Sequence, residues 1–283
     1  MNPRQQLLSV YRFLRPVVDG LRINSVARPI WGMLWRMPAK KLILAKQNGR
    51  EWWLDPDVAL GGETYEDQTI AWLRSVIKPG MTAVDIGANV GQISLEMAHL
   101  VGPTGRVISV EPSPGNIEFL KAHVSANGFD DRITIVEAAC CADDSGELVL
   151  EVAGDDPRSI ENGPQLKSIG LKQNPKDSGR PRSEVRVRAM SVDSLCGSIG
   201  VSPDVLKVDV EGAEVEVFRG AKAMLNRKKP RVIFGFHPFA FQKPNSARLE
   251  IKSILADAGL FVEGEDADES WTLREYTVAP WPR

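Results

Sequence analysis

The amino-acid sequence predicts an α/β fold built on one doubly wound, mostly parallel β-sheet with helices on both faces. Short apolar runs typical of buried strands alternate with stretches of helical periodicity from about residue 66 onward. The stretch from Thr82 to Pro112 reads as strand, glycine-rich turn, helix and strand, and it ends on an acid followed by proline. Ligands bind beyond the carboxyl ends of strands in open α/β sheets, so this stretch predicts a crevice lined by Asp85, Asn89 and Glu111.

Composition places the chain among ordinary globular proteins. It has 283 residues, of which 43% are hydrophobic and 25% charged, so it is long enough for a substantial core. The net charge of −2 gives no general case for nucleic-acid binding. The 3 cysteines make neither a disulfide framework nor a zinc spacing and suit a reducing compartment. No apolar run is long enough to span a bilayer and no secretory signal is evident, so a cytoplasmic protein is expected.

The first part of the chain, residues 1–60, is expected to form a basic helical arm followed by a β-hairpin. The arm carries many basic residues against one acid, Asp19, and apolar residues at helical spacing. Two interpretations stay open. The arm packs on its own domain or on a second copy of the chain, or it lies on an anionic membrane surface at the cytoplasmic face. Packing is favoured because membrane binding requires an unburied apolar face. Asn48-Gly49 within Lys41–Leu54 is a strong hairpin-turn signal.

The remaining residues, 61–283, are expected to form one α/β domain. Strands are expected at Ala83–Ile86, Val107–Val110, Arg132–Ala139, Glu147–Val152, Glu184–Ala189, Val205–Val210, Arg231–Phe236, Phe261–Val262 and Trp271–Val278. Helices are expected from Glu66 to Val76, after Gly91, around Ile117–Val124, from Glu214 through Leu225, and around Ile251–Leu255. The polar segment at about 154–183 has no clear period and is expected to be an inserted lid or loop.

Two nucleotide sites compete as explanations of the glycine-rich turn. A dinucleotide site requires G-x-G-x-x-G with a distal acid on the ribose, whereas this turn reads G-A-N-V-G from Gly87 to Gly91. Asp85 also stands inside the preceding strand, where that fingerprint has no acid. A nicotinamide-dependent oxidoreductase is therefore a disfavoured alternative. A module that holds a cofactor without catalysis is a second alternative.

The pattern V-D-I-G-A-N-V-G resembles the first motif of the class I S-adenosylmethionine-dependent methyltransferases. A second block, Leu206–Glu214 with Gly220-Ala221 after it, resembles the signature of the FkbM-type family, and Met190–Leu195 and Tyr65-Glu66 are similar to segments that precede its motifs. The resemblance covers about Gly61 to the last strands. It implies a Rossmann-like class I fold with a seven-stranded sheet, S-adenosylmethionine as cofactor, and a hydroxyl on a sugar, glycolipid or natural product as acceptor.

The resemblance also implies a set of site residues. Asp85 and the backbone from Gly87 to Gly91 would lie at the methionine end of the cofactor, and Glu111 would accept hydrogen bonds from both ribose hydroxyls. The full cofactor-binding set is Tyr65, Glu66, Asp85, Gly87, Ala88, Asn89, Gly91, Glu111, Pro112, Ala139 and Asp209. One departure is visible, because family members often carry Glu two residues before the His, where this chain has Gly235.

For the methyl transfer itself, the candidate catalytic residues are Asp209, His237 and Glu211. Asp209 is the first candidate for substrate positioning or base, and His237 is the second because imidazole titrates near neutral pH. Glu214 fits better as a first-turn acid favoured by the helix dipole. Asp209, Glu211 and Glu214 could also hold a divalent cation, as in metal-assisted O-methyltransferases, but no metal is expected because the rest of an oxygen cage is not evident.

The acceptor is expected to be a small-molecule, glycan or lipid-linked hydroxyl. Basic residues in the polar insertion could meet an anionic acceptor, although a solvated loop is the favoured interpretation of them: Lys167, Lys172, Lys176, Arg180 and Arg182.

Overall fold

The computed structural model describes residues 42–144, 146–153, 165–166, 182–263 and 274–280 of the chain. The predicted basic arm, and most of the predicted insertion with Lys167, Lys172, Lys176 and Arg180, lie outside the described residues. The chain divides into two compact units, Met1–Tyr65 and Glu66–Arg283, close to the domain boundary expected at residue 60.

The described part of the first unit is a β-hairpin followed by a short helix. Strands β1 (Ile43–Gln47) and β2 (Arg50–Leu54) pair antiparallel. Asn48 and Gly49 have φ angles of 50° and 82°, the left-handed conformations that a two-residue hairpin turn of this type requires. The sequence prediction of this hairpin is therefore confirmed. Helix α3 (Pro56–Leu60) follows, and the side chain of the preceding Asp55 caps its first turn.

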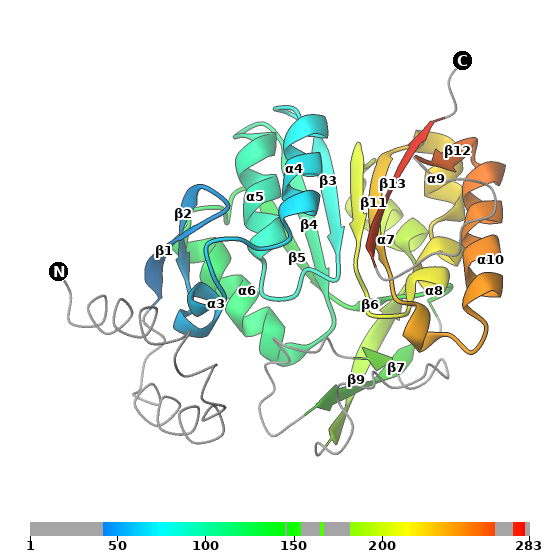
Figure 1. Cartoon of the computed structure of the whole chain (residues 1–283), viewed down its shortest axis with the longest axis horizontal. Coiled ribbons are helices and arrows are strands. Elements are labelled where there is room, and N and C mark those ends of the chain that lie inside the picture. Colours follow the sequence, from blue (N-terminus) through cyan, green and yellow to red (C-terminus); the bar gives the residue numbers. More distant parts are fainter. Residues whose placement is uncertain (1–41, 145, 154–164, 167–181, 264–273, 281–283) are drawn as a thin grey trace, which may run out of the picture. The chain divides into compact units, whose positions relative to one another are not determined.

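The second unit is organised by a seven-stranded sheet (Figure 1). Its strands, in spatial order, are β12 (Leu260–Val262), β13 (Arg274–Pro280), β11 (Arg231–Phe236), β10 (Val205–Val208), β3 (Thr82–Ile86), β4 (Arg106–Glu111) and β5 (Ile133–Glu137). The five strands from β11 to β5 run parallel, and β13 is antiparallel to both of its neighbours. The predicted doubly wound, mostly parallel sheet is confirmed.

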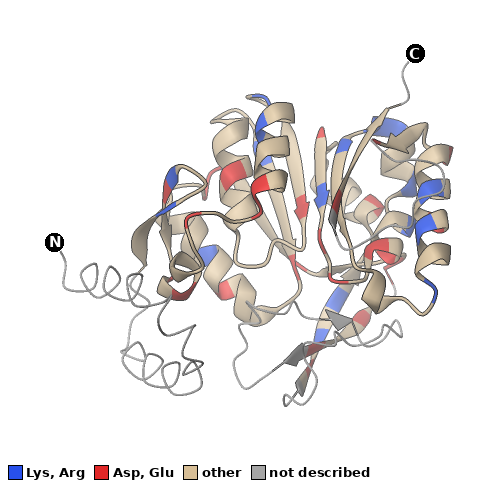
Figure 2. Ribbon diagram, in the orientation of Figure 1, with Lys and Arg blue, Asp and Glu red and all other residues tan. Residues whose placement is uncertain are grey.

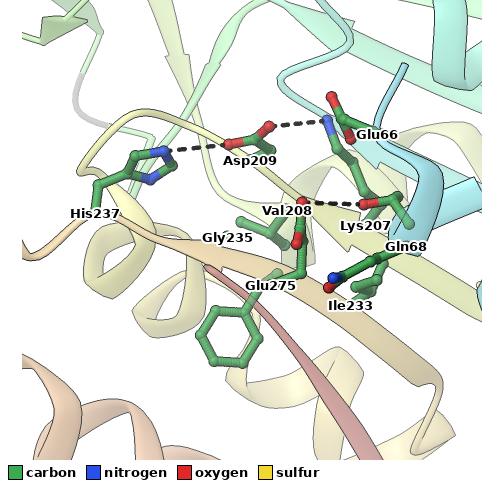
Figure 3. A pocket seen from close by; sticks show the side chains of 11 residues that line it. Glu66, Gln68, Lys207, Val208, Asp209, Ile233, Gly235, His237 and Glu275 are labelled. Atoms are coloured by element: carbon green, nitrogen blue, oxygen red, sulfur yellow. Dashed lines mark hydrogen bonds and ion pairs between the residues drawn. The ribbon is translucent and has the colours of Figure 1, made fainter. Parts of the chain in front are cut away.

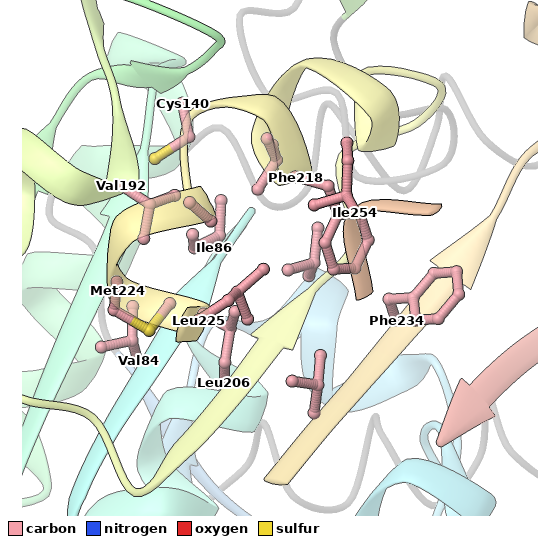
Figure 4. Close-up of a cluster of buried hydrophobic side chains, with 14 of the residues drawn as sticks. Val84, Ile86, Cys140, Val192, Leu206, Phe218, Met224, Leu225, Phe234 and Ile254 are labelled. Atoms are coloured by element: carbon pink, nitrogen blue, oxygen red, sulfur yellow. The ribbon is translucent and has the colours of Figure 1, made fainter. Parts of the chain in front are cut away.

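Helices flank the sheet in two sets. One set is α4 (Asp67–Val76), α5 (Gln92–Val101) and α6 (Pro114–Ala126). The other set is α7 (Val192–Ile199), α8 (Glu214–Arg219), α9 (Lys222–Lys228) and α10 (Pro244–Asp257), with the short 3-10 helix η3 (Pro238–Ala240) between β11 and α10. The second set buries an extensive apolar core against the sheet, where Phe218 packs edge-on against Phe234 with ring centroids 5.2 Å apart (Figure 4).

Three local predictions need correction. The strand expected over Arg132–Ala139 is two strands, because β5 ends at Glu137 and β6 (Ala139–Cys140) belongs to a second sheet. That second sheet has the order β6, β9 (Arg182–Met190), β7 (Glu147–Ala153) and β8 (Gln165–Leu166).

The helix expected from Glu214 through Leu225 is also two helices, α8 and α9, which meet at Gly220. A Cβ at Gly220 would lie 2.0 Å from the carbonyl oxygen of Cys141, so neighbouring backbone occupies the space that a side chain would need. The strand expected over Val205–Val210 ends at Val208, although the Asp209 amide still bonds the Ile86 carbonyl.

Charged positions of both signs occur on the helices and also within the sheet itself (Figure 2). The buried charged residues of the parallel strands are Asp85 on β3, Glu111 on β4 and Lys207 on β10, and Asp85 and Lys207 are direct partners in the strand register. Burying a charge is costly unless it is paired, so this pair marks the region of the sheet that needs a specific explanation.

Candidate active site

The turn between β3 and α5 passes very close to the end of β10. Gly87 has a φ of +79°, and a Cβ there would lie 1.8 Å from the Asp209 carbonyl oxygen. Gly91 has a φ of +95°, and a Cβ there would lie 2.5 Å from Leu120 Cδ1 of α6. Both glycines are therefore required by conformation and by space. They hold the turn between β10 on one side and α6 on the other.

A buried lysine ties this turn to the two central strands. Lys207 Nζ lies 3.2 Å from Asp85 Oδ1 and donates to the carbonyl oxygen of Gly87 over 3.0 Å. It also lies 3.9 Å from Asp209 Oδ2. Burial disfavours the ammonium, but the charges of Asp85 and Asp209, with Glu66 behind them, outweigh it and raise the pKa of Lys207. Lys207 is thus a fixed positive charge. The sequence pattern did not single it out.

Asp85 is held in place by two side chains inside the sheet. Its side chain is fully buried; Oδ1 pairs with Lys207, and Oδ2 accepts a hydrogen bond of 2.6 Å from Ser94 on α5. It does not cap the turn through backbone amides in any hydrogen bond of the described residues. Asp85 acts on the site through Lys207 and the turn.

Glu111, at the end of β4, is the centre of a second buried polar cluster. Its carboxylate accepts hydrogen bonds from the Asn89 amide at 2.9 Å, the Ser113 amide at 3.0 Å and Asn116 Nδ2 at 3.1 Å. Burial raises the pKa of Glu111, against these three hydrogen bonds. A carboxylate can accept about four hydrogen bonds, so about one acceptor position remains open on Glu111. The family resemblance implies that Glu111 accepts two, one from each ribose hydroxyl.

The side chains around Glu111 have unused hydrogen-bonding capacity. Asn89 Oδ1, Ser113 Oγ and Asn116 Oδ1 are buried, and none has a hydrogen-bond partner within the described part of the chain. Buried polar atoms in folded proteins are almost always paired. Three such atoms around one carboxylate at a strand end suit the ribose and adenine of a nucleoside, which supply both donors and acceptors.

A third cluster surrounds His237, directly after β11. Its Nδ1 lies 2.6 Å from Oε1 of Glu214, which is fully buried and also accepts from the Gly212 amide. Its Nε2 lies 3.7 Å from Asp209 Oδ1 and 3.6 Å from Glu211 Oε2. Burial opposes a charge on the imidazole, but Glu214 first and then Glu211 and Asp209 outweigh it and raise the pKa of His237 to about 9.

This cluster changes two expectations. His237 was chosen as a base because imidazole titrates near neutral pH, but with a pKa of about 9 it carries its proton at pH 7. Glu214 does stand in the first turn of α8, as expected, yet its carboxylate also binds and orients His237. The helix-dipole interpretation therefore missed its main contact, because Glu214 and His237 meet only through the packing of α8 beside β11.

A cavity of about 390 Å³ opens beyond the ends of β10 and β11 (Figure 3). Its wall is formed by Glu66, Gln68, Thr69, Lys207, Val208, Asp209, Ile233, Phe234, Gly235, His237 and Glu275. A Cβ at Gly235 would lie 3.1 Å from Asp209 Oδ1 and 3.3 Å from His237 Cε1, so glycine keeps the space between these two side chains open. Gly235 stands where family members often carry Glu. An acid nevertheless lies beside this position, because Glu275 of β13 is the cross-strand partner of Gly235.

Most of the predicted site residues gather at this edge of the sheet. Those on the cavity wall or on the strand ends and turn beside it are Glu66, Asp85, Gly87, Ala88, Asn89, Gly91, Glu111, Pro112, Asp209, Glu211 and His237. The other two predicted cofactor-binding residues do not line the cavity. Tyr65 belongs to the first unit, where its backbone bonds the side chain of Asn48. Ala139 is buried in β6 and does not line the cavity.

A family model described as the methyltransferase FkbM domain matches residues 85–261, which is more than half of the chain. The chain belongs to the FkbM methyltransferase family. The match includes the glycine turn, Glu111, Lys207, Asp209 and His237. The protein is therefore a methyltransferase with the class I Rossmann-like fold, and its methyl donor is S-adenosylmethionine. The nicotinamide alternative is set aside.

Individual relatives are distant. The chain is 26% identical to the methyltransferase sdnD of Sordaria araneosa over 214 residues, which cover 69% of this chain and 78% of that protein. It is 23% identical to the ribosomal protein L11 methyltransferase of Carboxydothermus hydrogenoformans over 128 residues, covering 44% of this chain and 38% of that protein. Among solved structures, the FkbM methyltransferase of Methylobacillus flagellatus has a TM-score of 0.43 at 16% identity. That match covers 75% of this chain and about half of the other, 51%.

The residues present fit the methyl donor. The Glu111 cluster offers unused hydrogen-bonding atoms for a nucleoside, and the Asn89 amide ties the glycine turn directly to it. An acidic side chain of the cavity wall such as Glu66 suits a ligand whose sulfonium and amino groups are positive. No helix among the described residues is long and apolar enough to cross a membrane.

The lysine at the centre of the site gives a stability prediction. Replacing Lys207 by Met should lower the free energy of unfolding by about 3–5 kcal/mol, because Asp85 remains buried without its counter-charge. The matched control is Lys121→Met, since Lys121 pairs with Glu137 in solvent and its loss should cost at most about 1 kcal/mol. Urea unfolding of the three proteins measures both values. Equal losses in the two variants would contradict the role given to Lys207.

The histidine cluster gives a prediction about pH. In an NMR titration with EDTA present, His237 should titrate near pH 9, and Glu214→Gln should return its pKa toward 6.5. Because the folded pKa is the raised one, the stabilisation by Glu214 should be complete below about pH 6.5 and be lost as pH rises through 9. His123, which is buried against the Val90 carbonyl and has a lowered pKa, is the internal control and should not respond. If the pKa of His237 is the same in Glu214→Gln as in the wild type, Glu214 is not the group that raises it.

Proposed function

We propose that the protein transfers the methyl group of S-adenosylmethionine to a hydroxyl oxygen of a sugar, glycolipid or natural product. The observation that carries this proposal is the cavity beyond β10 and β11, with the Asp209 carboxylate on its wall next to the glycine turn. The wall is rich in hydrogen-bond acceptors, the carboxylates of Glu66, Asp209 and Glu275. A polyhydroxylated acceptor presents the O–H donors that such a wall can bind.

The protonation states divide the roles among the charged groups of the cavity. Lys207 and His237 both have raised pKa values and hold their protons at neutral pH, so neither is the base. Asp209 has a side chain about one-third exposed, 32%, and lies between these two cations. It is therefore the group that accepts a hydrogen bond from the acceptor hydroxyl and takes its proton.

When bound, S-adenosylmethionine supplies a methyl group on a positively charged sulfur, and the hydroxyl oxygen displaces that sulfur, which keeps the electron pair of the broken bond. The protein contributes position and charge. The Glu111 cluster would hold the nucleoside and the glycine turn would hold the methionine end, while Lys207 fixes the turn against Asp209. Holding the two reactants in line accounts for most of the acceleration expected of such a displacement.

The proposal is tested by screening hydroxylated glycans, lipid-linked sugars and hydroxylated natural products with a labelled methyl donor. With an active acceptor, Asp209→Asn should lower kcat by about 10²–10⁴-fold, the typical contribution of a positioned base. Its Kd for S-adenosylhomocysteine, measured by calorimetry, should stay within a few-fold of wild type, because the role proposed for Asp209 is toward the acceptor.

The control for that experiment is Glu250→Gln, which removes an exposed carboxylate on α10 that pairs with Arg219 outside the cavity. It should retain full turnover. Full turnover of Asp209→Asn would show that Asp209 is structural. If the labelled methyl group is found on an amine of the acceptor, the reaction is N-methylation and the O-methylation proposal is wrong. Binding of S-adenosylhomocysteine without transfer to any acceptor in the screen would favour the non-catalytic alternative.

A further inference from the structure

We propose that Asp209, Glu211 and His237 form a binding site for a divalent transition-metal cation at the wall of the cavity. The site is a new one within the proposed function, and the role given to the cation rests on that function. The binding itself does not, because it depends only on three side chains and their geometry.

The three side chains converge on one point. One ligand atom from each of Asp209, Glu211 and His237 can be chosen so that all lie within 4.8 Å of one another. The imidazole Nε2 is 3.7 Å from Asp209 Oδ1 and 3.6 Å from Glu211 Oε2. These separations are too long for hydrogen bonds. Ligands at about 2.0–2.2 Å from a shared cation lie roughly 3.0–3.5 Å apart, so small side-chain movements complete the site.

The histidine is held as a metal ligand needs to be held. Glu214 fixes Nδ1 with a contact of 2.6 Å and is itself fixed by the Gly212 amide. Metal-binding histidines almost always have such a carboxylate or carbonyl partner on the other ring nitrogen. The side chain of His237 is only 9% exposed, and its Nε2 makes no hydrogen bond within the described residues but points at two carboxylates.

The charges around this point also favour a cation. Three carboxylates, from Asp209, Glu211 and Glu214, surround one imidazole. Lys207 approaches Asp209 on Oδ2 and leaves Oδ1 directed at His237. A proton on Nε2 and a metal ion at the same place are alternative ways to satisfy this arrangement, since both cannot occupy that nitrogen. Glu214, which the sequence offers as a cation ligand beside Asp209 and Glu211, instead contacts Nδ1 of His237.

The ligand set selects the kind of ion. Two carboxylates and one imidazole suit Mn²⁺ or Zn²⁺, whereas Mg²⁺ and Ca²⁺ prefer all-oxygen sites. Three protein ligands leave open positions on the cavity side. A hydroxyl bound there loses its proton more easily, because the cation stabilises the alkoxide. The cation would thus bind the acceptor oxygen and lower its pKa, while the atoms exchanged in the proposed reaction stay the same.

The site is tested by adding Mn²⁺ alone to the EDTA-stripped full-length protein. Binding is measured as the loss of the free Mn²⁺ signal in electron paramagnetic resonance. We expect one tight site per chain. Its Kd should rise at least tenfold in Glu211→Gln and in His237→Gln, and by about 10–100-fold in Glu214→Gln, the usual effect of removing such a support. Glu216→Gln is the matched control and should bind as wild type, because Glu216 pairs with Arg219 away from the trio. Mg²⁺ should compete at least tenfold more weakly than Zn²⁺.

Each outcome decides the proposal. The absence of saturable Mn²⁺ binding to the wild type, or equal affinity in His237→Gln, would overturn the metal site. Calorimetry with S-adenosylhomocysteine on the same samples confirms that each variant is folded and separates the two proposals. A protein that binds S-adenosylhomocysteine but no Mn²⁺ keeps the proposed function and loses this site. A protein that binds Mn²⁺ with the expected variant pattern but no S-adenosylhomocysteine keeps the metal site and loses the proposed function.

Discussion

One buried ammonium group sets the geometry of the carboxyl edge of the sheet. Lys207 satisfies Asp85 on the neighbouring strand, the carbonyl oxygen of Gly87 in the turn, and the nearer oxygen of Asp209. The burial of a charge is tolerated only when its partners are held in place, so this group constrains all three at once. The absence of a side chain at Gly87 is part of the same constraint, because the turn could not otherwise approach the Asp209 carbonyl.

This constraint joins two polar clusters that have different tasks. On one side, Glu111 binds the turn through the Asn89 amide and the start of α6 through Ser113 and Asn116. On the other side, Asp209 and His237 line the cavity, where Glu214 fixes the imidazole. A methyl donor bound to the first cluster and an acceptor bound to the second would meet over the turn. The proposed transfer and the proposed cation site both depend on this arrangement.

The sequence predicted the features that local patterns determine. The strands β3, β4 and β11, the Asn48-Gly49 hairpin and the need for glycine at Gly87 and Gly91 follow from periodicity and turn chemistry within a few residues. The features it missed depend on which distant segments become neighbours. Lys207 becomes important only when β10 pairs with β3 in a register that places it beside Asp85.

The same reason explains the other differences. From the sequence, Glu214 is an ordinary acid at the start of a helix, and only the packing of α8 brings it against His237. The raised pKa of His237 likewise depends on three carboxylates from separate positions that surround the imidazole. The need for glycine at position 220 depends on the Cys141 carbonyl, far away along the chain. Glu275 reaches the level of Gly235 only through the antiparallel pairing of β13 with β11. Each of these is a tertiary contact for which the sequence carries no local signal.

A crystal structure of the protein with S-adenosylhomocysteine would show whether the two polar clusters bind donor and acceptor as described. We expect the ribose hydroxyls within hydrogen-bond distance of Glu111, with Asn89, Ser113 or Asn116 taking up new partners, and the sulfur at the mouth of the cavity facing Asp209. Ligand bound elsewhere, with the Glu111 cluster unchanged and the sulfur turned away from Asp209, would refute this arrangement.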